Sequence, residues 1–393
     1  MVTPLNSALL AAQPVAQELL AALVRLPTEN PPGNVAEATA WLASYLEGRG
    51  HMVERHPVPA PFARHHNRAD LENLVVRRVF GEGPTIALHA PLDTLPAGAG
   101  WNREPFGGEI REGRLYGRGA RDSKADLAAY VAVLEALTAT GHGSGTLELH
   151  ITADEESGGF LGPAFLLSQG LTTPDMVIAA GTAYQVIVGQ EGVLHLEVVL
   201  RGRQAHASRP RDGSDAILAS LPILQALSVE ADKSAMALTI TTIGAGRGRN
   251  LVADRMRFTI DRRIAADESG DAVEAALQAL IEGSHTVDGV SVECRRTLLA
   301  EPVTPTAPSM RLAHTLSRHA EAVFQQAIPV GSAPVVSGAR HYALAGIPTA
   351  LYGVGPPVIG EGVDMSGDEW VSLEDLERAT LALGAAVGEL LGG

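Results

Sequence analysis

The sequence of 393 residues has very little cysteine, few aromatic residues and no excess of positive charge. Its single cysteine, Cys294, excludes a disulfide within the chain and a cysteine-based zinc cluster, and is typical of a reducing compartment. Lysine and arginine total 30 against 45 aspartate and glutamate residues, a formal net charge of -15. Because no basic run is present, binding to a nucleic-acid backbone is disfavoured. We therefore expect no nucleic-acid partner.

The amino-terminal segment lacks the features of a secretion signal. No positive charge comes early in it, and asparagine, glutamine and glutamate interrupt its apolar residues. This pattern predicts an amphipathic helix that ends near Pro27, with no membrane span. We expect a cytoplasmic protein that does not act at a membrane.

Most of the hydrophobic residues are aliphatic, because 46% of the chain is hydrophobic but only 4% is aromatic. The length exceeds that of one ordinary core, so two domains are expected. In the first half, short aliphatic runs bounded by glycine and proline alternate with helical patterns, which predicts an α/β sheet with helices on its faces. The predicted strands cover 71–80, 85–90, 146–153 and 176–181, and a helix covers 124–141.

The pattern changes after residue 193. Strands are predicted at 192–202, 237–243, 256–264 and near 290–296, with helices at 215–228 and 271–283. The resulting β-α-β-β-α-β order predicts a small, separate α+β domain inserted into the larger sheet. Strand and helix signals at 348–355 and 373–391 return to the first domain. We therefore predict a catalytic domain from 1–193 and 301–393, with an inserted domain at 194–300.

Three consecutive acidic residues, Asp154, Glu155 and Glu156, follow one predicted strand and precede two glycines. Ligands gather at strand ends of an α/β sheet, and glycine lets the backbone approach them. Adjacent acids repel each other, so solvent, a cation or a raised pKa must offset the repulsion. Taken alone, the segment also fits a solvated loop. Likewise Asp122, in a glycine-rich turn that enters a helix, fits an ordinary N-cap.

The order of several motifs carries more information than each alone. They are an apolar strand with His-x-Asp character, WNREPFGGEIREGRLYGRGARDSKAD, a strand ending DEE, RGRQAHASRP, GIPTALYGVG and the acidic turn GDEW. In this order, from LVRLPTENPPGN to VSLEDL, the chain resembles the co-catalytic zinc metallopeptidase family of the aminoacylases, acetylornithine deacetylase, succinyl-diaminopimelate desuccinylase and carboxypeptidase G. The resemblance implies a zinc-exopeptidase-like mixed α/β sheet between helices, with an inserted α+β lid and dimerisation domain.

The resemblance also implies roles for individual residues. Asp122 matches the bridging aspartate, Glu155 the general base and Glu156 a metal-binding glutamate, while Asp93 matches the aspartate that orients the first metal-binding histidine. His206 matches the histidine that reaches a partner's active site in dimeric members, which predicts a homodimer. The predicted catalytic residues are thus Glu155, Glu156, Asp122 and His206. The predicted substrate-binding residues are Asn250, Arg263, Arg340 and His341.

Three of the five expected metal ligands are replaced in this sequence. Pro91 stands where the first histidine belongs, Ala180 replaces an acidic ligand and Met365 replaces the final histidine. Zinc takes three or four nitrogen, oxygen or sulfur ligands from a protein, and a methionine thioether is a weak donor to it. His89 points to the same face of its strand as Pro91 but lies about 6 to 7 Å further back. We therefore predict that zinc is abandoned.

The remaining carboxylates predict metal-independent acid/base chemistry on a small, carboxylate-bearing, amino-acid-like amide, with Glu155 as base. At least one of Glu155 and Glu156 is expected to have a raised pKa. The reaction class stays open between amide cleavage or formation, elimination, isomerisation and cyclisation. Five other histidines show no ligand spacing and are assigned no site role: His142, His150, His195, His314 and His319.

Two alternatives remain. The first is a metal-dependent amidohydrolase, an N-acyl amino acid deacylase or dipeptidase, with a rearranged site for one divalent ion of zinc, manganese or cobalt. The residual candidate ligands for such an ion are Asp122, Glu156, His89, Asp93, His341, Asp364 and Asp368. The second alternative is a catalytically inactive binding protein.

Overall fold

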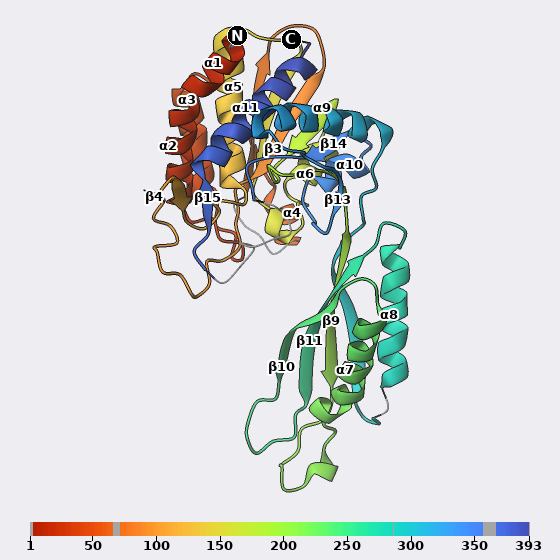
Figure 1. The fold of residues 1–393 in the computed structure, drawn as a ribbon. Coiled ribbons are helices and arrows are strands. Elements are labelled where there is room, and N and C mark those ends of the chain that lie inside the picture. Colours follow the sequence, from red (N-terminus) through yellow and green to blue (C-terminus); the bar gives the residue numbers. More distant parts are fainter. Residues whose placement is uncertain (1–2, 66–70, 286, 357–366, 393) are drawn as a thin grey trace. The chain divides into compact units, whose positions relative to one another are not determined.

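The structure is a computed structural model that describes residues 3–65, 71–285, 287–356 and 367–392 (Figure 1). The chain divides into two compact units. Unit 1 comprises Met1–Gly189, Pro305–Ala333 and Ser337–Gly393, and unit 2 comprises Gln190–Thr304 with Pro334–Val336.

An eight-stranded mixed sheet forms the centre of unit 1, as the sequence predicts. Its order is β1 (Val53–Pro57), β2 (Glu72–Val79), β6 (Thr146–Thr152), β3 (Thr85–Pro91), β7 (Met176–Ala179), β14 (Thr349–Leu351), β8 (Val186–Gln190) and β13 (Val330–Ala333). The strand β3 runs parallel to both β6 and β7, whereas β2 pairs antiparallel with β1 and β6. Parallel β3 and β6 bring their carboxyl ends, and the acidic residues that follow them, to one edge.

Helices cover this sheet. The helices of unit 1 are α1 (Pro4–Ala11), α2 (Gln13–Val24), α3 (Ala36–Gly48), α4 (Ala60–His65), α5 (Lys124–Thr140), α6 (Pro163–Ser168), α9 (Ala307–Phe324), α10 (Arg340–Leu344) and α11 (Leu373–Leu390). The helix α5 is buried along most of its length among α1, α2, α11 and β3, which explains why its sequence is apolar on all sides. A small sheet of β15 (Trp370–Ser372), β5 (Arg114–Tyr116) and β4 (Glu109–Arg111) completes the unit.

The amino-terminal helix expected to end near Pro27 is two helices, α1 and α2, and the second ends at Val24. Pro14 lies in the first turn of α2, where a missing backbone N–H costs nothing. The segment Pro4–Val24 is long and apolar enough to cross a membrane by length and composition, and half of its most apolar window is buried inside the fold.

Unit 2 has the predicted β-α-β-β-α-β order. Its elements are β9 (Gly192–Arg201), the short helix η2 (Pro210–Asp212), α7 (Ala216–Lys233), β10 (Leu238–Ala245), β11 (Arg255–Ile264), α8 (Gly270–Ser284) and β12 (Ser291–Ala300). The antiparallel sheet has the order β10-β11-β9-β12, and α7 and α8 lie side by side on one of its faces (Figure 1). Alternate residues of β9 and β11 face these helices and form the core of the unit.

A buried carboxylate joins the start of α5 to the chain that follows β14. Asp126 accepts a hydrogen bond of 2.7 Å from the backbone N–H of Val354, and Tyr130 donates one of 3.1 Å to the carbonyl of Tyr352. A Cβ added at Gly353 would lie 1.6 Å from the Asp126 carboxylate oxygen and 2.9 Å from the backbone nitrogen of Gly181. Only glycine therefore fits between these two groups.

We predict that Gly353→Ala lowers the free energy of unfolding by about 3 kcal/mol, because the Asp126 carboxylate must leave its donor. Gly331→Ala in β13 is the matched control, since its added Cβ would meet only Gln185 Nε2, at 3.9 Å. Urea unfolding of both variants measures the difference. Equal stabilities would show that Asp126 moves freely.

Candidate active site

Both candidate glutamates are held by one buried aspartate. Glu155 and Glu156 begin the short helix η1 (Glu155–Ser157) that follows β6. The Asp93 carboxylate, almost fully buried, accepts hydrogen bonds from the backbone N–H of Glu155 at 3.1 Å and of Glu156 at 3.2 Å. Asp93 thus fixes the backbone of the turn of Glu155 and Glu156, which is named the catalytic turn for its predicted role.

Asn30 completes this anchor and was missed by the sequence analysis. Its side-chain amide donates to Asp93 at 2.8 Å, and its side-chain oxygen accepts from the Ser157 hydroxyl at 3.3 Å. The backbone of the same loop pairs with Thr94, since Asn30 donates to the Thr94 carbonyl at 2.8 Å and Thr94 donates to that of Thr28 at 3.0 Å. Two prolines follow Asn30 in the sequence, but no local pattern indicates the contact of Asn30 with Asp93. Only the fold reveals it.

The turn that precedes Asp122 is fixed by Glu369. This buried carboxylate accepts hydrogen bonds from Arg118 Nη1 at 2.8 Å, the Gly119 N–H at 3.0 Å and the Arg121 N–H at 2.8 Å. Asp122 itself accepts a hydrogen bond of 2.6 Å from the Ser123 hydroxyl, across a cis peptide bond. Glu369, in the acidic turn that precedes α11, thus fixes the segment that carries Asp122.

Four carboxylates lie close enough to interact electrostatically and form one cluster: Asp93, Asp122, Glu155 and Glu156. Burial, followed by the charges of Asp122 and Asp93, raises the pKa of Glu156 from 4.5 to about 8. Burial, followed by the charges of Glu156, Asp122 and Asp93, raises the pKa of Glu155 well above its ordinary value. The expectation of at least one raised pKa is therefore confirmed. Near neutral pH the cluster retains protons in the metal-free protein.

Arg340 lies beside this cluster. Its guanidinium is almost fully buried, 5.4 Å from the centre of the Phe160 ring, and Glu155 and Asp154 are its electrostatic neighbours. Burial lowers the pKa of Arg340 to about 10, so the side chain remains a cation at neutral pH. Within the described part of the chain, its guanidinium donates no hydrogen bond to a protein acceptor. A buried cation with unused donors is suited to binding a carboxylate ligand.

His341, predicted to bind substrate beside Arg340, contacts the catalytic turn. Its Nε2 donates a hydrogen bond of 2.8 Å to the carbonyl oxygen of Gly158, and its ring contacts Phe160 at 5.3 Å between centroids. Burial and the charge of Arg340 lower the pKa of His341 to about 4, so the imidazole is neutral near pH 7. The contacts give His341 a structural part in holding this turn.

The other predicted site residues lie in unit 2. The His206 and Asn250 segments are adjacent, because Ala207 donates to the Asn250 carbonyl at 2.9 Å, and the exposed His206 ring contacts the Ser208 hydroxyl at 2.8 Å. Arg263 in β11 forms an ion pair of 3.0 Å with Asp261. The assignments of His206, Asn250 and Arg263 to catalysis or substrate binding stay predictions.

The described residues do not fit the two-metal site that the resemblance implies. Pro91 and Ala180 offer no donor atom, and in the described part of the chain no three His, Cys, Asp or Glu side chains are arranged to hold a metal ion. His89 is fully buried with Nε2 at 3.0 Å from the Thr152 hydroxyl, and burial lowers its pKa to about 3. Asp368 accepts hydrogen bonds from the backbone of Asn102 and Arg103. Met365 and Asp364 lie outside the described residues.

Comparison with known proteins agrees with the fold. The sequence matches Peptidase family M20/M25/M40 over residues 87–389. It is 27% identical to a succinyl-diaminopimelate desuccinylase from Wolinella succinogenes, over 81% of this chain and 88% of that protein. The structure is similar to the di-peptidase Dug1p from Saccharomyces cerevisiae, with a TM-score of 0.81, 13% identity and coverage of 100% and 99% of the two chains.

A further similar structure is the YXEP protein of Bacillus subtilis, described as a dinuclear metal-binding peptidase of the M20 family. Its TM-score is 0.67, with 18% identity over 97% of this chain and 99% of that one. The family match spans well over half of the chain and includes the turns that carry Asp122, Glu155 and Arg340. The protein is a hydrolase-fold enzyme that belongs to peptidase family M20/M25/M40.

Proposed function

We propose that this enzyme cleaves the amide bond of a small, carboxylate-bearing, amino-acid-like molecule by acid/base chemistry without a metal, with Glu155 as base. The observation that carries the proposal is the raised pKa of both Glu155 and Glu156, which keeps protons on this pair near neutral pH. The sequence adds Pro91 and Ala180, which have no donor atom, at two positions where the resemblance implies ligands of a two-zinc site.

Carboxylates that share protons supply both an acid and a base at neutral pH. In the proposed step the pair of Glu155 and Glu156 shares one proton, which lies on Glu156, and the charge of Arg340 favours the ionised form of Glu155. Glu155 then takes a proton from water as the water oxygen bonds to the amide carbonyl carbon. The carbon–nitrogen bond then breaks, and a protonated carboxyl of the cluster, Glu156, gives its proton to the leaving nitrogen. His206 is proposed to stabilise the oxyanion, and Arg340 to hold a substrate carboxylate through two parallel hydrogen bonds.

The names of the similar proteins support the substrate class. A desuccinylase removes a succinyl group, which carries a free carboxylate, from an amide nitrogen, and a dipeptidase cleaves an amide beside a free carboxylate. Both substrates would present a carboxylate to a buried cation such as Arg340. Succinylated and acetylated amino acids are therefore the first probes. Localisation in the cytoplasm, expected from the sequence, is part of the same proposal.

One observation favours a second candidate, a metal-dependent amidohydrolase of the same substrate class. The similar YXEP protein is described as binding two metals, and Asp122 and Glu156 remain here as carboxylate donors for one divalent ion of zinc, manganese or cobalt. The two candidates differ in whether turnover depends on an added ion.

We predict that Glu155→Gln lowers kcat on N-succinyl or N-acetyl amino acids by about 10²- to 10⁴-fold, the usual contribution of a general base. Glu112→Gln, at an exposed turn, should retain parent activity. EDTA should leave the parent unchanged, and elemental analysis after dialysis from excess zinc should find none. Loss of activity in EDTA with recovery on zinc, manganese or cobalt would establish the metal-dependent candidate. Ligand binding without any conversion would indicate a binding protein.

Stability of the metal-free protein should depend on pH through Glu156. Because the pKa of Glu156 is raised from 4.5 to about 8 on folding, its contribution is complete below pH 4.5 and is lost as the pH rises through 8. We predict that Glu156→Gln gains stability relative to the parent between about pH 5 and pH 9, on the order of 2 kcal/mol after allowance for solvent screening. Urea unfolding in EDTA measures this, with Glu112→Gln as control. A stability difference between Glu156→Gln and the parent that does not grow as the pH rises would contradict the raised pKa.

We also propose that unit 2 forms a homodimer. The helix α7 packs on its sheet through Ala219, Ile223 and Leu227, while Leu218 and Leu221 on another face are more than half exposed. The strand β10 lies at the edge of the same sheet. An exposed apolar stripe beside an open strand edge is self-complementary under two-fold symmetry.

Leu221→Glu should shift the protein from dimer to monomer in light scattering coupled to size-exclusion chromatography, because a charge would enter the apolar contact. Val79→Glu, at an apolar position in unit 1 that is also more than half exposed, should leave the dimer unchanged. A monomeric parent would refute the proposed dimer.

A further inference from the structure

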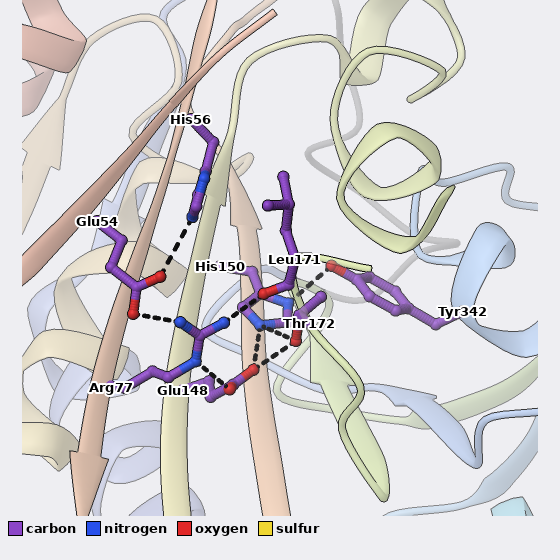
Figure 2. Close-up of polar contacts among 8 residues, drawn as sticks. All are labelled: Glu54, His56, Arg77, Glu148, His150, Leu171, Thr172 and Tyr342. Atoms are coloured by element: carbon purple, nitrogen blue, oxygen red, sulfur yellow. Dashed lines mark hydrogen bonds and ion pairs between the residues drawn. The ribbon is translucent and has the colours of Figure 1, made fainter. Parts of the chain in front are cut away.

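A second polar cluster lies in unit 1, outside the carboxylate cluster. We name it the β6 network; it consists of Arg77, Glu148, His150, Thr172 and Tyr342 (Figure 2). Glu148 and His150 are two positions apart on β6 and therefore point to the same face of the sheet. Both are almost completely buried, as is Tyr342. No site role was expected for His150, because nothing in the local sequence reveals its partners.

His150 lies at the centre of the β6 network, between Glu148 and Tyr342. His150 Nε2 lies 2.7 Å from a Glu148 carboxylate oxygen, and its Nδ1 lies 2.8 Å from the Tyr342 hydroxyl. Burial alone would raise the pKa of Glu148, but hydrogen bonds from His150, Thr172 and Arg77 lower it to about 2. The ionised carboxylate only accepts, so His150 Nε2 donates to Glu148. The Tyr342 hydroxyl bonds to Nδ1 on the other side of the imidazole ring.

Arg77 stabilises the outer end of the β6 network. Its Nε donates to Glu148 at 2.6 Å, and its other nitrogens contact Glu54 and the carbonyl oxygen of Leu171. The Thr172 hydroxyl also donates to Glu148, at 2.5 Å. The buried charge of Glu148 is thus fully paired, and a fully satisfied buried network is rigid.

Tyr342 joins the inner end of the network to α10, which carries Arg340 and His341. A helix of five residues has no stability of its own, so its position depends on tertiary contacts. The Tyr342 ring stacks on His150 at 5.8 Å and meets His89 edge-on at 5.5 Å. On its other side α10 holds the catalytic turn, through the hydrogen bond from His341 to Gly158 and the contact of Arg340 with Phe160.

We propose that Tyr342, held by His150 and Glu148, is a positioning residue that fixes Arg340 beside Glu155 and so sets the affinity for the substrate carboxylate. The consequence for affinity rests on the proposed function, whereas the placement of Arg340 does not. Figure 2 shows the polar contacts that run from Arg77 through Glu148 and His150 to Tyr342, which is a residue of α10.

Tyr342→Phe removes the hydroxyl and keeps the ring. Tyr352→Phe is the matched control, because the Tyr352 hydroxyl is also fully buried in unit 1 but has no hydrogen-bond partner among the described residues. The first readout is the rate at which phenylglyoxal modifies Arg340 in the full chain, followed by mass spectrometry and normalised to the exposed Arg111. Loss of one buried hydrogen bond should raise this rate about fivefold in Tyr342→Phe and leave it unchanged in the control.

The second readout separates binding from chemistry. On N-succinyl amino acids, Tyr342→Phe should raise KM about fivefold with kcat near the parent value. Glu148→Gln, which removes the charge without touching α10, should move both readouts in the same direction. A purely structural loss would instead reduce the amount of folded enzyme and leave KM unchanged.

Equal phenylglyoxal rates in the parent and Tyr342→Phe would overturn the inference, whatever the activity. If the parent turns over no N-acyl amino acid, the proposed function fails, and the phenylglyoxal rates still decide the positioning role. A rate of Arg340 modification that rises in Tyr342→Phe and Glu148→Gln, but not in Tyr352→Phe, would support the positioning role of Tyr342.

Discussion

Repulsion among neighbouring carboxylates is the constraint on which the candidate site of unit 1 depends. Burial, together with the charges of Asp122 and Asp93, raises the pKa values of Glu155 and Glu156. In metal-dependent enzymes cations offset such repulsion. In the metal-free protein, protons and the positive charges of Arg340 and Arg118 offset it instead. The same protons make the cluster suited to acid/base chemistry.

Side chains that repel each other stay close only if the backbone that carries them cannot move apart. Asp93 and Asn30 fix the turn of Glu155 and Glu156, while Glu369 fixes the turn before Asp122 by accepting three hydrogen bonds. These anchors come from loops far apart in the sequence. The repelling side chains are therefore held together by hydrogen bonds to their backbones, which carry no net charge themselves.

The β6 network shows a different solution to a buried charge. Hydrogen-bond donors surround Glu148 and lower its pKa, whereas burial and the neighbouring carboxylates raise the pKa values of Glu155 and Glu156. The first arrangement produces rigidity and the second produces exchangeable protons. Both arrangements meet at α10, because Tyr342 contacts the network and Arg340 lies beside Glu155.

Periodicity and motif order in the sequence determined the fold class, the main strands and α5, the order of elements in unit 2, and the acidic turn of Glu155 and Glu156. These features are encoded by neighbouring residues, so a local pattern reveals them. The local pattern did not predict the short strands β8 and β13. It predicted one N-terminal helix where the structure has two, α1 and α2. Only the tertiary structure decided that Asn30 and Glu369 anchor the site and that His150 supports α10. Each role depends on a partner between 63 and 251 residues away, and a hydrogen bond across that separation leaves no periodic signal in the chain.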